Sequence, residues 1–600
     1  MCGIIGYVGS GRQPAQEVLL DGLERLEYRG YDSAGIAVAN STLDVHKRSG
    51  ELSALENSLA DREFNGAVGI GHTRWSTHGS PSHENAHPHT DCEGRVAVVH
   101  NGIISNADAL RAELVEAGHR FESETDTEVV PHLMRVFLDD GAEPEAAFER
   151  ALDRLEGSYA IAAVVADSDA IYASRRQSPL VVGLGEKERY LASDVPAFIE
   201  HTDRVIYLED GQFVRLTPGN VAVTDGNGSL VDPTVESIDW DPADVGKSGY
   251  DHYMLKEIYE QPRAVRQCTR GRVTEMAGSL ELSELPASVR SGTDRVQLVG
   301  CGTSFYAMQY GASLLCEHGI PAQPFVASEY DADSIPIEPD TLVVAVTQSG
   351  ETADTLGALR AANRAGATTL AVTNVVGSSA ARECDAAVYI RAGPEISVAA
   401  TKSFASQQVT LAMIASVLAE RQSQPFLGAL RDLPSRIQHV LDTSSARHVA
   451  EEIVDADAYF FVGRRYQYPV ALEGALKMKE ITYEHAEGFA AGELKHGPLA
   501  LVTPRTPVVA LVTGSEDVVD RTLGTVREVE ARGAPVVAVT TSSAPVEPVA
   551  DYVLEVPETH RHLVPILTNV QLQLLAYWTA DLLGRPIDKP RNLAKSVTVE

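Results

Sequence analysis

Cysteine is scarce in this sequence, and long apolar runs are missing. Six cysteines are spread over 600 residues without a CxxC pair, which excludes a disulfide scaffold and predicts free thiols in a reducing compartment. Apart from Cys2, we expect them to be core residues. The longest apolar runs, such as residues 159–166, are too short to cross a bilayer, and Arg12, Glu17 and Asp21 interrupt the N-terminal segment early, unlike a secretory signal. We therefore expect a cytoplasmic protein with no membrane partner.

Positively charged residues are also few. The chain has 50 Lys and Arg residues against 84 Asp and Glu residues, a net charge of −34, and only ten of the basic residues are lysines. The electrostatic field of so negative a protein repels the phosphate backbones of nucleic acids, so nucleic acid is excluded as a partner. An acidic, lysine-poor surface is typical of a salt-adapted protein, in which counterions screen the self-repulsion. Simple acidic drift is the alternative explanation.

The length predicts two to four domains. The first 230 residues combine short β-rich runs with two helical patterns, which predicts a mixed α and β domain. Strands are expected at 2–8, 34–39, 67–75, 96–104, 159–165, 180–184, 204–208 and 213–216, and helices at 106–117 and 126–138. A polar stretch rich in Pro, Asp and Gly, residues 232–250, predicts a linker.

Beyond residue 250 a pattern of strand, Ser/Thr/Gly-rich loop and helix occurs twice. VQLVGCGTS (296–304) resembles YFFVGRRYQ (459–467), VVAVTQSGE (343–351) resembles VVALVTGSE (508–516), and GATTLAVT (366–373) resembles GAPVVAVT (533–540). The offsets of 163, 165 and 167 are nearly constant, which indicates a duplicated unit. Apolar runs without alternation are typical of strands covered on both faces, so each half is expected to be a doubly wound parallel α/β sheet.

Cys2 follows the initiator methionine directly. If the methionine is removed, this residue offers both a thiol and a free α-amine. Reference pKa values of about 8.5 for the thiol and about 7.7 for the amine place a general base beside the nucleophile. The position therefore favours an N-terminal nucleophile, although a Met-Cys start by itself is a weak signal.

Five segments strengthen that hypothesis, namely MCGIIG (1–6), RLEYRGYDSAG (25–35), GHTRWSTHG (71–79), HNGIISN (100–106) and SETDTE (123–128). Together they resemble the class II glutamine amidotransferases, which implies an Ntn-type αββα glutaminase sandwich over residues 2–231. The resemblance implies that Cys2 attacks the side-chain amide of glutamine, while the Asn101 amide and the Gly102 N–H form the oxyanion hole.

The same resemblance assigns the residues that hold glutamine. Arg74 binds the α-carboxylate and Asp126 the α-ammonium, a choice that charge complementarity also favours; an ordinary surface ion pair is the alternative. Further glutamine-binding positions are Arg29, Thr77 and His78, and Trp75 corresponds to the gate of an ammonia channel.

A zinc site is a competing interpretation of HENAHPHTDC (83–92). His83, His87, His89 and Cys92 are the residue types that bind zinc, but their spacing is irregular and no CxxC or HExxH accompanies them. We therefore expect no metal at this loop.

Two hydroxyl-rich turns, CGTS (301–304) and TQSGET (347–352), each follow a predicted strand and precede a predicted helix. Their hydroxyls and the N–H groups of the helix N-termini would hold a phosphate without a lysine. The turns resemble those of the sugar isomerase (SIS) fold, and no GxGxxG or P-loop indicates a nucleotide. Two tandem SIS domains are expected, at 285–428 and 450–590, with the sugar phosphate bound by Thr303, Ser304, Thr347, Gln348, Ser349 and Thr352.

A charged helix and the last residues complete the second half. Glu473, Lys477, Glu480 and Glu484 recur at helical spacing, which places them on one face; a solvated ion-pair ladder is the alternative. GELKHGP (492–498) places His496 in a Gly-rich turn. The tail, residues 591–600, contains Lys595 and is expected to fold into the sugar site, with Leu593, Val597 and Val599 as anchors.

With HYMLKEIYEQP (252–262), SVAATKSF (397–404) and PRNLAKSVTVE (590–600), the whole chain resembles the isomerizing glutamine–fructose-6-phosphate aminotransferases. The resemblance implies that Lys595 forms a Schiff base with the open-chain ketose, His496 assists ring opening, and Glu480 moves a proton between C1 and C2, with Lys477 beside it. Val398 and Ala594 match positions that contact the sugar.

The activity implied is the conversion of L-glutamine and D-fructose 6-phosphate to glucosamine 6-phosphate and glutamate, the first step of amino-sugar formation. No cofactor or metal is expected, because the iminium is itself the electron sink, and the family implies a homodimer. Other class II amidotransferases would need an acidic diphosphosugar loop or an SGGxDS loop, and neither occurs. A non-catalytic SIS sensor would have no use for Cys2, the glutaminase motifs and Lys595 together.

Overall fold

The computed structural model describes residues 2–11, 13–75, 80–226, 228–238, 246–273, 278–542 and 544–597. These residues divide into two compact units. The first comprises the chain up to Gly246 together with the segment from Ala594, and the second is Lys247–Leu593.

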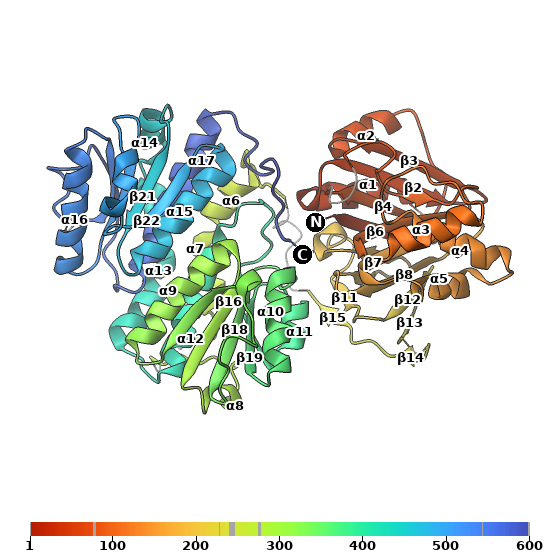
Figure 1. Cartoon of the computed structure of the whole chain (residues 1–600), viewed down its shortest axis with the longest axis horizontal. Coiled ribbons are helices and arrows are strands. Elements are labelled where there is room, and N and C mark those ends of the chain that lie inside the picture. The colour runs from red at the N-terminus through yellow and green to blue at the C-terminus, as the bar shows by residue number, and fades with distance from the viewer. Residues whose placement is uncertain are drawn as a thin grey trace. The chain divides into compact units, whose positions relative to one another are not determined.

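The first unit is built on two antiparallel sheets (Figure 1). The order in the larger sheet is β15 (Glu236–Ser237), β11 (Arg204–Tyr207), β9 (Val181–Leu184), β10 (Arg189–Ala192), β1 (Gly3–Val8), β4 (Val68–Arg74), β2 (Ser33–Ala39) and β3 (Leu43–Ser49). The order in the other is β14 (Leu230–Val231), β13 (Asn220–Thr224), β12 (Phe213–Thr217), β8 (Ile171–Arg176), β7 (Gly157–Val165), β6 (Val96–Ile104) and β5 (His89–Thr90).

Helices cover the outer faces of both sheets, so the expected αββα sandwich is confirmed. Inward-facing side chains such as Ile4, Val8 and Ala162 form the core between the sheets. A second core joins β6 and β7 to the helices through residues such as Leu110 and Phe148. The helices of this unit are α1 (Ala15–Leu26), α2 (Leu52–Leu59), α3 (Ala107–Glu116), α4 (Val129–Asp139) and α5 (Pro144–Leu152).

The second unit contains two five-stranded parallel sheets with the same strand order, which confirms the predicted duplication (Figure 1). One consists, in order, of β17 (Ala322–Val326), β16 (Arg295–Gly300), β18 (Thr341–Thr347), β19 (Thr368–Thr373) and β20 (Ala386–Tyr389). The other consists of β22 (Ala486–Ala490), β21 (Tyr459–Gly463), β23 (Val508–Val512), β24 (Val536–Thr541) and β25 (Tyr552–Val556).

The helices of the second unit pack around both sheets, and one apolar core runs through the two halves. They are α6 (Tyr253–Tyr259), α7 (Gln261–Thr269), α8 (Ala287–Arg290), α9 (Gly302–Glu317), α10 (Ala353–Arg364), α11 (Ser379–Glu383), α12 (Lys402–Leu418), α13 (Gln424–Thr443), α14 (Ala446–Ile453), α15 (Gln467–Thr482), α16 (Glu516–Glu530) and α17 (Val564–Leu582). Helix α6 contributes Met254 and Ile258 to this core, so the second unit begins well before residue 285.

Three sequence expectations differ from the structure in detail. Part of the predicted linker, Glu236–Ser237, forms the edge strand β15 against β11. Helix α15 ends at Thr482 because Tyr483 adopts a left-handed conformation with φ 66°, so Glu484 leaves the predicted helix face and pairs with Arg585. Of the five other cysteines only Cys268 is buried, whereas Cys92 and Cys316 are exposed.

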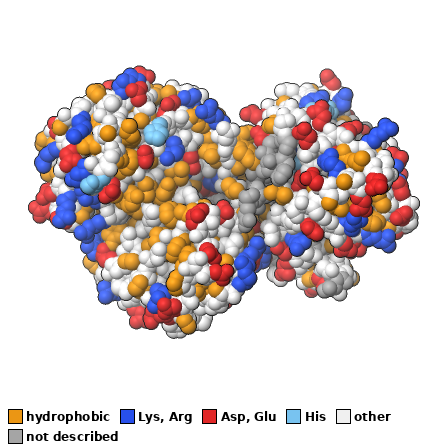
Figure 2. All heavy atoms as spheres, viewed as in Figure 1, with side chains coloured by type: hydrophobic (Ala, Val, Ile, Leu, Met, Phe, Trp, Pro, Cys, Tyr) orange, Lys and Arg blue, Asp and Glu red, His pale blue; other side chains and the backbone are white. Residues whose placement is uncertain are grey.

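Acidic and basic side chains are interspersed on the face seen in Figure 2, without a single-sign patch that dominates it. No helix in the described part of the chain is both long enough and apolar enough to span a membrane.

Candidate active sites

Cys2 directly precedes the buried strand β1, which fixes its backbone. Its carbonyl oxygen accepts hydrogen bonds from Asn101 Nδ2 at 2.9 Å and from Arg29 Nε at 3.3 Å. The backbone N–H of Trp75 donates to the Cys2 Sγ at 3.2 Å. The Sγ in turn lies 3.5 Å from the carbonyl oxygen of Trp75, so these two contacts hold the thiol in one position.

Asn101 lies on β6, and His72 on β4 fixes the direction of its amide. His72 Nε2 is 3.0 Å from Asn101 Oδ1 and 3.1 Å from the carbonyl oxygen of His100. Both neighbours are acceptors, so Nε2 carries the proton. Because Asn101 Oδ1 accepts this bond, its Nδ2 is directed at Cys2. Sequence reasoning missed His72, since nothing in the chain around residue 72 shows that it faces Asn101.

Gly102 has a φ of 132°, a conformation that other residues rarely adopt. A Cβ at this position would lie 2.1 Å from the carbonyl oxygen of Ser158 on the neighbouring strand. The backbone at the candidate oxyanion hole therefore requires glycine.

Arg74 ends β4 and is buried. Burial lowers the pKa of its guanidinium, while negative charge on Cys2, Asp32 and Asp126 opposes that shift. The Asp126 carboxylate accepts a 2.7 Å hydrogen bond from the N–H of Ile104, at the end of β6. The structure thus brings a cation and a carboxylate together near the thiol, which suits a zwitterionic amino acid. Thr77 and His78 lie outside the described residues.

The guanidinium of Arg29, which was predicted to bind glutamine, is engaged with other residues of the chain. It pairs with Asp194 at 2.8 Å, and the Tyr28 hydroxyl donates to the same carboxylate at 2.6 Å. Together with the bond to the Cys2 carbonyl, these contacts hold the residue just before β1 in place.

A layer of buried histidines lies behind Asn101. The His72 and His87 rings are 4.2 Å apart, and the His87 and His89 rings 4.6 Å. Nε2 of His87 contacts Thr127 at 2.9 Å, and Nε2 of His89 contacts Thr125 at 3.0 Å. Burial lowers the pKa of His72 to about 3 and holds the pKa values of His87 and His89 well below their ordinary value. The layer is therefore neutral at pH 7.

The hydroxyl-rich turns of the second unit lie at helix N-termini, as expected. Thr303 and Ser304 are in the first turn of α9, and Ser304 Oγ accepts from Gln407 at 2.9 Å. Thr347 ends β18, and its Oγ1 is 3.0 Å from that of Thr352, which precedes α10. Between them, Ser349 Oγ accepts from the N–H of Glu351 at 3.1 Å.

Gly350 sits in the tight turn after Gln348 and Ser349, with φ 70°. A Cβ there would lie 2.1 Å from Ser378 Oγ. The turn thus closes against the segment after β19, and only glycine fits.

Lys477 on α15 is the centre of a buried cluster. Its Nζ lies 2.5 Å from Glu480 Oε2, 3.5 Å from Glu473 Oε1 and 3.2 Å from Thr303 Oγ1. Thr303 Oγ1 in turn donates to Glu473 at 3.1 Å. The cluster joins a hydroxyl of the first SIS half to the charged helix of the second, and Glu473 and Lys477 are fully buried, which rules out the solvated ladder for these two.

The surroundings of this cluster shift the pKa values of Glu473 and Lys477. Burial raises the pKa of Glu473 to about 8, with Glu480 adding to the rise and Lys477 opposing it. Burial works against the charge of Lys477, but Glu473 and Glu480 hold the pKa of its ammonium above the ordinary value. At pH 7 a protonated Glu473 therefore leaves Lys477 paired mainly with Glu480.

Buried carboxylates shape the loop that carries Val398, a feature that sequence reasoning missed. Glu395 accepts from the N–H groups of Thr401 and Ser403, each at 2.9 Å. Glu257 on α6 accepts from the N–H of Ser397 at 3.1 Å. The N–H of Val398 itself donates to the carbonyl oxygen of Asp588 at 3.1 Å, which connects this loop to the segment before the tail.

His496 and Lys595 are placed in different parts of the structure. His496 is exposed on a one-turn 3-10 helix, Leu494–His496, in the second unit. Ala594 and Lys595 belong to the first unit and are half-buried. Val597 is 51% exposed, so the prediction that it anchors the tail is wrong, whereas Leu593 is half-buried; Val599 lies outside the described residues.

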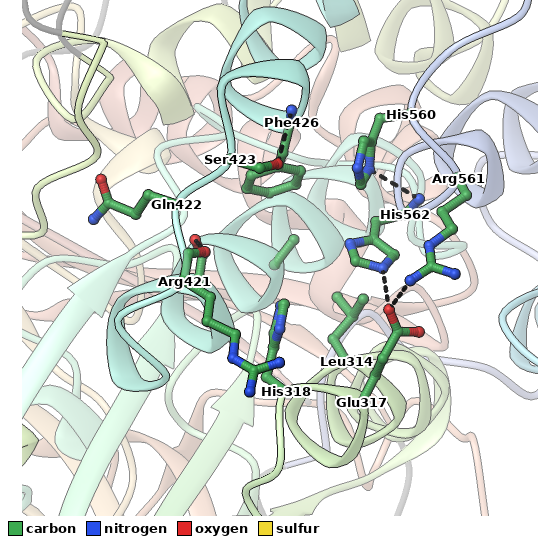
Figure 3. Close-up of a pocket in the computed structure, with 12 residues that line it drawn as sticks. Leu314, Glu317, His318, Arg421, Gln422, Ser423, Phe426, His560, Arg561 and His562 are labelled. Atoms are coloured by element: carbon green, nitrogen blue, oxygen red, sulfur yellow. Dashed lines mark hydrogen bonds and ion pairs between the residues drawn. The ribbon is translucent and has the colours of Figure 1, made fainter.

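A separate pocket of about 380 Å³ lies in the second unit and contains none of the predicted site residues (Figure 3). Glu317, at the end of α9, points toward His562 and Arg561 on the loop before α17. Its carboxylate accepts from His562 Nε2 at 3.1 Å and pairs with Arg561. These contacts tie the first SIS half to the second.

Family comparisons agree with the two-unit organisation. A glutamine amidotransferase domain model matches residues 72–200, and an SIS domain model matches twice, at residues 291–417 and 452–582.

Curated relatives match along their full length. Proteins named glutamine–fructose-6-phosphate aminotransferase (isomerizing) are 51% identical in Halobacterium salinarum, 49% in Symbiobacterium thermophilum and 48% in Thermus thermophilus, and each match covers 100% of both chains. Among solved structures, the C-terminal domain of glucosamine-fructose-6-phosphate aminotransferase from Francisella tularensis is 35% identical, with a TM-score of 0.53 over 57% of this chain and 100% of that one.

Proposed function

The chain belongs to the family of isomerizing glutamine–fructose-6-phosphate aminotransferases, and from that premise we propose how its residues divide the reaction. The enzyme transfers the amide nitrogen of glutamine to fructose 6-phosphate and yields glucosamine 6-phosphate and glutamate. The observation that carries this function is the presence, in one chain, of a thiol flanked by a cation and a carboxylate and of a buried Lys477–Glu480 pair beside hydroxyl-lined helix N-termini.

In the glutaminase half, the Cys2 thiolate attacks the side-chain carbonyl carbon of glutamine. Removal of Met1 frees the α-amine of Cys2, which accepts the thiol proton and later delivers it to the leaving ammonia. The Asn101 amide and the Gly102 N–H stabilise the oxyanion. Water then cleaves the thioester to glutamate. The bond from the Trp75 N–H to Sγ at 3.2 Å holds the sulfur in place for this attack.

Recognition of glutamine uses opposite charges at the α-carbon. Arg74 pairs with the α-carboxylate and Asp126 with the α-ammonium, and Thr77 and His78 complete the pocket. For Arg29 we propose a positioning role, because its guanidinium is engaged with Asp194 and with the Cys2 carbonyl.

In the isomerase half, the hydroxyls and N–H groups at the N-termini of α9 and α10 bind the phosphate. Lys595 condenses with the C2 carbonyl of the open-chain ketose and loses water, and ammonia then displaces this lysine. Glu480 removes the C1 proton and returns it at C2, while Lys477 at 2.5 Å holds that carboxylate in place. His496 assists ring opening. Backbone groups of Val398 and Ala594 contact the sugar, and Trp75 gates the ammonia.

We also propose a cytoplasmic homodimer. All six cysteines are free, which suits a reducing compartment. Sedimentation equilibrium should give twice the chain mass of 64.4 kDa, and a monomer at micromolar concentration would contradict the dimer.

Trapping the Schiff base tests the assignment of the sugar half. Borohydride added with fructose 6-phosphate should fix the sugar on Lys595, and peptide mapping should find the added mass in the C-terminal peptide. Lys595→Arg should remove both the label and the isomerisation but leave glutamine hydrolysis intact. Cys2→Ala is the matched control, since it should lose glutamine hydrolysis and keep the label. Labelling at Lys477 or Lys402 would show that another lysine forms the imine.

A further inference from the structure

Three side chains outside both active sites direct soft donor atoms at one point of the first unit. Cys92 lies in the turn between β5 and β6, His119 follows α3, and His132 is on α4. One donor atom from each residue lies within 4.8 Å of the other two. The Nδ1 atoms of His119 and His132 are only 3.1 Å apart, a spacing close to that of two ligands on one tetrahedral ion with metal–nitrogen bonds of about 2.0 Å.

His132 is held by the protein in the orientation that a ligand needs. Its ring is fully buried, and its Nε2 lies 3.8 Å from Glu128 Oε1. Glu128 is itself fixed, since it accepts from the N–H groups of Glu122 and Ser123 at 2.7 Å each. At 3.8 Å this carboxylate faces the imidazole without a direct hydrogen bond, so it is burial that fixes the ring.

The local balance of charge favours a cation, although two arginines belong to the cluster. Arg135 donates to Cys92 Sγ at 3.2 Å, as N–H groups do to metal-bound thiolates. Its guanidinium also pairs with Glu93 at 2.5 Å, Asp139 at 3.2 Å and Asp91 at 3.6 Å. Asp139 also pairs with Arg95 at 2.7 Å, so three carboxylates face two arginines and the local balance stays negative.

Against the expectation of no metal at residues 83–92, we propose that Cys92, His119 and His132 form a binding site for a borderline-soft divalent cation of the zinc class, with the fourth coordination position left to water. Binding displaces the thiol proton of Cys92 to the solvent and forms one metal–sulfur and two metal–nitrogen bonds. The site connects the β5–β6 turn to both ends of the segment 119–132. Because Asp126 lies in that segment, the cation stabilises the carboxylate assigned to the α-ammonium of glutamine.

Cobalt titration of the full-length enzyme tests this site. One equivalent of Co²⁺ should bind with an absorption band from thiolate-to-cobalt charge transfer, and Zn²⁺ should displace it. Cys92→Ser should lose the band, and His119→Ala, a change at a partly exposed position, should weaken Co²⁺ binding at least about tenfold. Cys316→Ser controls for an exposed thiol, and Cys2→Ala for chelation by the terminal thiol and amine; both should keep the band.

The measurement can also overturn the proposal. Binding that Cys92→Ser and His119→Ala leave unchanged would place the ion elsewhere. If the wild-type chain shows no saturable Co²⁺ binding, the proposed site is ruled out. The three residues then form only a hydrogen bond between two imidazoles beside a thiol. A rise in KM for glutamine on chelation, with kcat retained, would support the proposed effect on Asp126.

Discussion

At the residue scale, the two sites depend on neighbours that take no part in bond making. His72 carries its proton on Nε2 and so turns the Asn101 amide toward Cys2. Glu473 is kept neutral by burial and leaves Lys477 to Glu480. Each of these residues acts through another, so its replacement should change one half-reaction only.

Replacement of His72 by Phe keeps a buried ring but removes the donor that orients Asn101. We expect kcat for glutamine hydrolysis to fall by about 10–100-fold, less than the loss of an oxyanion donor itself, with KM nearly unchanged and isomerisation intact. His72→Gln, which can donate through Nε2, should recover part of the loss. His201→Phe, whose ring stacks on Tyr190, is the control. Full hydrolysis by His72→Phe would remove the positioning role.

Glu473 offers a test in the isomerase half. Because burial raises the pKa of its carboxyl to about 8, Glu473→Gln copies the protonated form and should keep most of the isomerisation at pH 7. Glu473→Ala leaves a cavity and deprives Thr303 Oγ1 of its acceptor, so it should cost about 2–5 kcal/mol of stability. Activity assays and urea unfolding of both variants provide the comparison. Equal damage by the two substitutions would show that Glu473 works as a carboxylate.

At the scale of elements, strand β4, strand β5 and the residues just before β5 place neutral histidines side by side behind the glutaminase site. In the folded chain the pKa of His72 is about 3 and the pKa values of His87 and His89 are also depressed, against about 6.5 when unfolded. Below pH 6.5 the unfolded chain therefore binds protons that the folded chain excludes. Stability should fall as pH falls from 6.5 toward 3.

The magnitude can be measured. Each excluded proton lowers the free energy of unfolding by about 1.4 kcal/mol per pH unit. Urea unfolding of the full chain between pH 7 and pH 5, followed through Trp75 with Trp240 and Trp578 replaced by Phe, should show this slope. His89→Phe removes one of the three histidines and should reduce this slope by the contribution of one excluded proton, about 1.4 kcal/mol per pH unit. A free energy independent of pH would mean that the layer is protonated in the folded state.

Elements were predictable from the sequence where local pattern decides them. The apolar runs at β1, β16 and β21 predicted buried strands, and the constant offsets predicted equal sheets. The end of α15 was missed, since it depends on the backbone conformation of Tyr483. The histidine layer and the Cys92 cluster join side chains from separate strands and helices, and no spacing along the chain reveals such neighbours.

At the scale of the whole molecule, net charge sets the conditions for folding. The charge of −34 acts over a Debye length of about 30 Å at 0.01 M salt but only about 3 Å at 1 M. We therefore expect the thermal midpoint of the chain to rise with KCl concentration. Calorimetry from 0.01 M to 3 M KCl checks this. A midpoint that is flat or falls with salt would remove the salt-adapted interpretation and leave acidic drift.

The whole chain also has to couple its two chemistries, because ammonia released by one half is the substrate of the other. Ammonia that escapes to water at neutral pH is protonated and no longer nucleophilic. Coupled transfer therefore predicts that nitrogen moves from glutamine to the sugar without mixing with ammonium in the medium.

Isotope transfer tests that central claim most directly. The enzyme is incubated with fructose 6-phosphate and glutamine labelled with ¹⁵N in the side-chain amide, in excess unlabelled ammonium, and the products are analysed by mass spectrometry. The account predicts glucosamine 6-phosphate that carries ¹⁵N with little dilution, and no product from Cys2→Ala with glutamine. Absence of the amino sugar, or a product labelled only as the ammonium pool is labelled, would contradict it.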